Sequence, residues 1–215
     1  MIVNTAALRS LYTGFSAAFQ GAFEGVTPIW NRIAMEVPST TRQNEYGWLG
    51  QFPRMREWLG ERVVESLTAS TYALRNRTFE STIGVKREDI EDDNIGIYNP
   101  IFQEFGRASA AFPDELVYGV LAGGFTGLCY DGRPFFDAQH PVLDAAGNVI
   151  QVSNTGGGAG TAWYILDVSR AVKPFIYQPR RSFTLTRMDA LSDEEVFTKG
   201  EYRYGTDGRC NAGYG

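Results

Sequence analysis

Residues 46–62 read YGWLGQFPRMREWLGER, a stretch that interleaves large aromatic side chains with arginines. Burying this segment inside a small domain would bury several guanidinium groups, which is costly unless each one is paired. A solvated loop, in turn, would leave its two tryptophans in water. Aromatic anchors rimmed by arginine are typical of a protein–protein interface. We therefore expect an extended ribbon that packs on another subunit. The alternative is an amphipathic hairpin folded on the protein's own core.

The ribbon is expected to contact its neighbour through apolar anchors at the centre and charged pairs around them. The residues that would make these inter-subunit contacts are Trp48, Phe52, Arg54, Arg56, Glu57, Trp58 and Arg62.

Composition and charge narrow the range of functions. The 215 residues, 43% of them hydrophobic, suffice for one large domain or two small ones. The net charge is −5, and no basic run is longer than Arg180-Arg181, which argues against a nucleic-acid-binding module that grips a phosphate backbone. An acidic protein can still enclose DNA, because like charges keep the DNA from adhering to it.

Cysteine content and hydropathy favour a reduced compartment. Cys129 and Cys210 are too few for a disulfide framework, although one disulfide between them stays open, and no Cys-x-x-Cys pair offers a zinc site. The longest apolar run is far shorter than the ~18 residues of a membrane span. The N-terminus shows no signal-peptide pattern. We expect a cytosolic setting and no membrane segment.

Two helices stand out in the first half of the chain. Apolar residues at helical spacing predict a helix over residues 5–25, which we interpret as an N-terminal arm that needs a partner surface. The same spacing predicts the longest helix from Ile101 to the glycine pair at 123–124, with Asn99 as N-cap and a kink or break at Pro113.

The remaining pattern is mixed. Alternation predicts a strand over 79–86, and the acidic cluster that follows it (87–93) indicates a solvated short helix or an inter-subunit salt-bridge patch rather than a calcium loop. Beyond residue 125 the chain is rich in glycine. There we expect a short helix at 166–172 and strands at 175–177, 182–186 and 195–204.

One segment, residues 130–144 (YDGRPFFDAQHPVLD), could carry chemistry. It holds the single histidine, His140, and Asp137 three residues before it could bind a metal with it or orient it as a base. A lone histidine in a proline-rich turn, however, more often hydrogen-bonds to backbone, and Phe135 and Phe136 look like anchors that plug the loop into a core. We expect Cys129 to be a buried, inert thiol. No catalytic, cofactor-binding or metal-binding residue is expected.

Several motifs together resemble one family. They are residues 46–62, TYALRNRTFESTIGVKREDIEDDNIGIYNP (71–100), CYDGRPFFDAQHP (129–141), KPFIYQPRR (173–181) and RYGTDGRCNAGYG (203–215). In this order they are similar to the major head subunits of Mu-like phages and prophages, from about residue 5 to the end of the chain.

The resemblance implies an α+β fold of the Hong Kong 97 capsid type. Laid on this sequence, it implies an N-terminal arm (1–41), an extended β-hairpin loop (42–75), a peripheral domain with a long spine helix (76–124) and an axial domain (125–215). Members of the family are usually longer, so the C-terminal part of the axial domain is expected to be missing here.

The function implied is that of a major capsid protein with no enzymatic activity and no cofactor. Hexamers and pentamers of the chain would form an icosahedral virion shell, assembled in the bacterial cytoplasm, which encloses double-stranded DNA without sequence-specific binding. Expected partners are a scaffold or protease, the portal and other head proteins. The alternatives are a metal-dependent hydrolase centred on Asp137 and His140, or another phage structural protein of the tail or decoration type.

Overall fold

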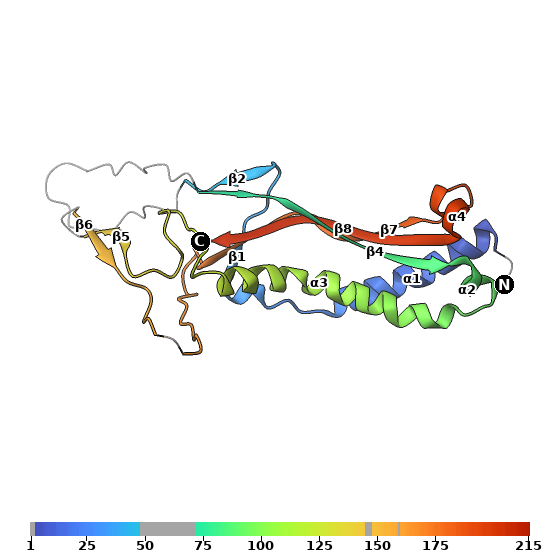
Figure 1. The fold of residues 1–215 in the computed structure, drawn as a ribbon, viewed down its shortest axis with the longest axis horizontal. Coiled ribbons are helices and arrows are strands. Elements are labelled where there is room, and N and C mark those ends of the chain that lie inside the picture. The colour runs from blue at the N-terminus through green and yellow to red at the C-terminus, as the bar shows by residue number, and fades with distance from the viewer. Residues whose placement is uncertain (1–2, 48–71, 145–147, 159) are drawn as a thin grey trace. The chain divides into compact units, whose positions relative to one another are not determined.

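The computed structural model describes residues 3–47, 72–144, 148–158 and 160–215 (Figure 1). All seven residues expected to contact a neighbouring subunit, from Trp48 to Arg62, lie outside the described residues. The interface assigned to them therefore stays a prediction.

The described chain mixes helices and strands, as an α+β fold requires. The α-helices are α1 (Thr5–Gly25), α2 (Arg87–Glu91), α3 (Tyr98–Ala122) and α4 (Glu194–Lys199). The strands are β1 (Ala34–Glu36), β2 (Gln43–Glu45), β3 (Ala73–Arg75), β4 (Arg77–Lys86), β5 (His140–Leu143), β6 (Val149–Val152), β7 (Phe175–Met188) and β8 (Glu201–Tyr214). Two short 3-10 turns, η1 (Trp30–Arg32) and η2 (Ile95–Ile97), complete the set. None of the described helices is long and apolar enough to cross a membrane.

The largest sheet has the strand order β1-β7-β8-β4. β4 and β8 pair antiparallel over their ten-residue overlap, from Arg77 opposite Cys210 to Lys86 opposite Glu201. β1 pairs parallel with β7. β2–β3 and β5–β6 form two separate antiparallel pairs.

The structure divides into two compact units that share several elements. The first unit comprises residues 1–29, 77–115 and 179–210, and the second comprises 30–76, 116–178 and 211–215. Residues 179–210, which the family resemblance places in the axial domain, thus belong to the same unit as 77–115. The correspondence of these units to a peripheral and an axial domain stays a prediction.

The core of the first unit is aromatic and draws on α1, α3, β4 and β8 (Figure 1). Phe15 of α1 stacks on Phe102 of α3 with ring centroids 4.2 Å apart, and it meets Tyr204 of β8 edge-on at 5.4 Å. Such pairs contribute about 0.5–1.5 kcal/mol each beyond the area they bury. The helix expected at 5–25 is confirmed in extent. It contributes buried side chains to this core, where a core element was not expected, and the assignment of residues 1–41 to an N-terminal arm stays a prediction.

The structure corrects further expectations. α3 runs unbroken through Pro113, so of the predicted kink or break the break is wrong. The helix begins at Tyr98, directly after η2, so the predicted N-cap at Asn99 is wrong as well. Residues 194–199 form α4, where the start of a strand was expected, and Gly200 at φ 64° separates that helix from β8. No helix forms at 166–172, and the two strands expected after it are the single strand β7.

Gly106 decides how closely α3 approaches α1. A Cβ atom at this position would overlap the backbone carbonyl group of Phe19, which cannot move away as a flexible side chain could. We therefore expect Gly106→Ala to destabilise the protein by about 1–3 kcal/mol through overpacking. Gly119→Ala on the same helix has open space around its Cβ, and we expect it to stabilise by up to about 1 kcal/mol. Denaturant unfolding of both variants measures the difference, and equal effects would contradict the close contact.

Candidate functional site

The segment between α3 and β5 folds back on itself as a tight turn. The Cys129 amide donates to the Arg133 carbonyl at 2.8 Å, and Gly132, at φ 76°, donates its amide to the Cys129 carbonyl at 3.1 Å. The Asp131 Oδ1 atom accepts a hydrogen bond from the Arg133 amide at 2.9 Å, and this side-chain bond to the backbone stabilises the turn. The backbone thus holds the side chains at 129 and 131 on the same turn.

Two aromatic side chains fix this segment in the second unit. The Phe135 ring stacks on Tyr214 at a centroid distance of 4.9 Å and lies 5.2 Å from Phe175. Phe136 contacts Phe125 and Tyr164 at 5.1 and 5.4 Å. The expected anchoring of the loop by these two phenylalanines is confirmed.

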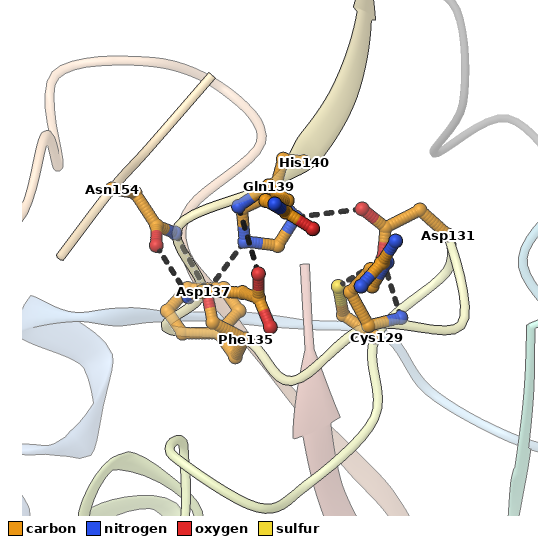
Figure 2. A network of polar contacts seen from close by, with 8 residues as sticks. Cys129, Asp131, Phe135, Asp137, Gln139, His140 and Asn154 are labelled. Atoms are coloured by element: carbon orange, nitrogen blue, oxygen red, sulfur yellow. Dashed lines mark hydrogen bonds and ion pairs between the residues drawn. The ribbon is translucent and has the colours of Figure 1, made fainter. Parts of the chain in front are cut away.

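A polar network connects the turn to the start of β5 (Figure 2). The Asp131 Oδ2 atom lies 2.6 Å from His140 Nδ1, and the Cys129 thiol donates to Asp131 Oδ1 at 2.9 Å. His140 Nε2 faces the Phe135 carbonyl at 3.2 Å, as expected for a histidine that bonds to backbone. That carbonyl also accepts the Asn154 side-chain amide at 2.6 Å.

Asp137, the carboxylate expected to act with His140, is occupied elsewhere. Its Oδ1 accepts the Gln139 amide at 2.7 Å, and its own amide donates to Asn154 Oδ1 at 2.8 Å. Figure 2 shows Asp131 as the carboxylate that is paired with His140. The sequence did hold a signal for this pairing, because Asp131 is followed by Gly132 in a turn that returns the chain toward residue 140. Spacing along the chain nevertheless favoured Asp137, the nearer aspartate.

The electrostatics of the network keep its carboxyl charged and its thiol neutral. Burial opposes ionisation of Asp131, but hydrogen bonds from Cys129, His140 and the Arg133 amide outweigh it and hold the pKa of that carboxyl below its usual value. Burial, followed by the hydrogen bond to Asp131, raises the pKa of the Cys129 thiol to about 12. Cys129 and Cys210 are both buried and form no disulfide with each other, so the expected burial of Cys129 is confirmed, and its inertness stays a prediction.

Comparison with known proteins identifies the family of this chain. Residues 8–215 match the family model described as "Mu-like prophage major head subunit gpT". The chain belongs to this family. It is 46% identical over 221 residues to the major capsid protein of Escherichia phage Mu, covering 100% of this chain and 72% of that protein. It is 41% identical to the FluMu prophage major head subunit of Haemophilus influenzae, covering 97% of this chain and 70% of that protein.

Solved structures agree with the family. The procapsid of bacteriophage JBD30 superposes with a TM-score of 0.82 and 48% identity, covering 99% of this chain and 73% of that one. The JBD30 capsid superposes with a TM-score of 0.69 and 37% identity, covering 100% and 70%. The α+β fold of the Hong Kong 97 capsid type is confirmed. The major head subunit is a structural protein and not an enzyme, and nothing supports a hydrolase at Asp137 and His140.

The buried thiols give a direct test of the site's geometry. Because thiolate is the reactive form, a pKa near 12 and burial should make Cys129 unreactive toward a disulfide reagent at neutral pH. We expect the folded protein, in the presence of a chelator, to react at least about 100-fold more slowly than the protein unfolded in guanidinium, where both cysteines should titrate. Rapid labelling of Cys129 in the folded protein would contradict the burial of this turn.

Proposed function

We propose that copies of this chain assemble into hexamers and pentamers of an icosahedral shell that encloses double-stranded DNA. Membership of the major head subunit family supports a shell, and the similarity to the JBD30 procapsid and capsid supports the assembled form. The net charge of −5 is compatible with an inner wall to which packaged DNA does not adhere. Assembly in the host cytoplasm, and a scaffold or protease, a portal and other head proteins as partners, belong to the same proposal.

The observation that carries self-assembly is an exposed apolar segment in the second unit. Trp163 is 78% exposed and Ile165 is 82% exposed. Between them, the Tyr164 ring contacts Phe136 and Phe125. Exposed large apolar groups are typical of a binding surface, and each gains about 1.5–3 kcal/mol when it is buried.

A second copy of the chain is the partner that fits this surface best. A shell repeats every subunit contact many times, so modest individual contacts combine into a stable assembly. Apolar anchors that are left exposed on one subunit can then be buried on the next at little cost to the folding of either.

The double variant Trp163→Ala/Ile165→Ala tests this contact. We expect its free energy of unfolding to lie within about 1 kcal/mol of that of the wild type, because both side chains are exposed. Assembly, in contrast, should fall at least tenfold. Electron microscopy and light scattering measure assembly, and round shells or five- to six-fold oligomers are expected for the wild type.

The matched control is Phe102→Ala, whose side chain is fully buried and should cost about 3–5 kcal/mol of folding stability. This variant should lose folding and assembly together. Wild-type assembly by the double variant would exclude this surface, whereas tubes or monomers at every concentration from the wild type would favour a tail or decoration protein and contradict the shell.

The ribbon of residues 48–62 makes a separate prediction. If Trp58 is an anchor on a neighbouring subunit, Trp58→Ala should reduce assembly far more than it reduces the stability of the isolated chain. Thermal unfolding at low concentration and assembly at high concentration separate the two effects. An equal loss in both measurements would place Trp58 in the core of its own subunit.

A further inference from the structure

We propose that Cys129, Asp131 and His140 form a binding site for a zinc ion. The sulfur of Cys129, a carboxylate oxygen of Asp131 and a ring nitrogen of His140 all lie within 4.8 Å of one another (Figure 2). The site needs only residues of the second unit, so the proposal does not depend on assembly of the chain into a shell.

The donor set selects the metal. Thiolate and imidazole together favour Zn²⁺ among the common divalent ions, whereas Mg²⁺ and Ca²⁺ prefer oxygen ligands. Bonds of about 2.0–2.3 Å to a tetrahedral zinc place neighbouring ligand atoms roughly 3.3–3.8 Å apart. The Asp131–His140 and Cys129–Asp131 contacts are now 2.6 and 2.9 Å. The side chains therefore have to separate by only about 1 Å to admit the ion.

The hydrogen bonds of His140 prepare it as a ligand. Both ring nitrogens face oxygen atoms that accept hydrogen bonds: Asp131 Oδ2 at Nδ1 and the Phe135 carbonyl at Nε2. In the tautomer that carries its proton on Nε2, the ring donates to the Phe135 carbonyl, which is how a backbone carbonyl orients a metal-binding histidine. The lone pair on Nδ1 then faces the Asp131 carboxylate, and a metal ion can lie between these two atoms.

At Cys129 a zinc ion would replace a proton. The thiol donates its proton to Asp131 in a hydrogen bond, and a zinc ion stabilises the thiolate strongly enough to displace that proton. Binding Zn²⁺ would release the thiol proton to solvent, and Nδ1 would bind the ion through its lone pair while Nε2 carries the ring proton. The ion's two positive charges would be balanced by the thiolate and the carboxylate. A charge-neutral set suits a site whose His140 and Asp131 side chains are only 14% and 6% exposed.

The ion would connect two segments that the chain otherwise joins by a loop. Two ligands lie on the turn at 129–133, and the third begins β5. The Phe135 and Phe136 anchors lie between them in sequence. Zinc would therefore tie down both ends of the anchored loop, with water as the fourth ligand because the cluster supplies three protein ligands.

The experiment measures metal binding by the full-length chain after treatment with a chelator. We expect one zinc per chain by mass spectrometry after gel filtration, and a rise in Tm of about 5 °C with Zn²⁺ but not with Mg²⁺. Cobalt substituted for zinc should show the charge-transfer band of a cobalt–thiolate bond. Cys210→Ala should keep this band, which assigns it to Cys129.

Matched variants separate the site from its surroundings. Cys129→Ser keeps a donor to Asp131 but removes the thiolate, and His140→Asn removes the imidazole; each should weaken zinc binding at least about 100-fold. Asp137→Asn changes the nearby carboxylate outside the cluster and should bind zinc as the wild type does.

Two results would overturn the proposal. The first is no zinc above background and no cobalt–thiolate band in the wild type, which would mean that protons alone satisfy the network. The second is zinc binding that Cys129→Ser and His140→Asn leave unchanged, which would place the metal elsewhere. The cobalt spectrum of the wild type remains decisive even if a variant fails to fold.

Discussion

The contact of Phe15 with Phe102 and Tyr204 is the interaction on which the first unit depends. It joins three elements that are far apart in sequence: α1, α3 and β8. α1 contains glycines at positions 14 and 21, each of which costs about 1 kcal/mol in a helix, so the helix is stabilised mainly by the surface it packs on. The missing side chain at Gly106 lets the two helix backbones approach closely enough for these rings to meet.

Local periodicity predicted the elements well, and it failed where a distant partner decides the outcome. The extents of α1, α3 and β4 follow from spacings that a few residues determine. The spacing of apolar residues in α1 could not show whether its apolar stripe faces its own subunit or another one. Residues 194–199 form a helix that the left-handed Gly200 separates from β8, a boundary that alternation alone does not reveal.

The polar site shows the same distinction between near and distant neighbours. In sequence, Asp137 is the closest carboxylate to His140, yet the turn that Gly132 permits brings Asp131 to the imidazole and leaves Asp137 to bond with backbone. The residue types were therefore predictable, and their pairing was not. The same fold that buries Cys129 also places its sulfur beside a carboxylate and an imidazole, a consequence that only the folded turn makes visible.

The distribution of aromatic residues separates the stability of the subunit from its capacity to assemble. Phe15, Phe102 and Tyr204 are buried and hold the first unit, whereas Trp163 is largely exposed beside a tyrosine that is itself packed. A subunit that buried every aromatic ring would fold well and offer little to a neighbour. One that exposed them on a mobile chain would pay conformational entropy for each contact. The contact of Tyr164 with Phe136 restrains the residue between the two exposed side chains, which would lower that entropy cost.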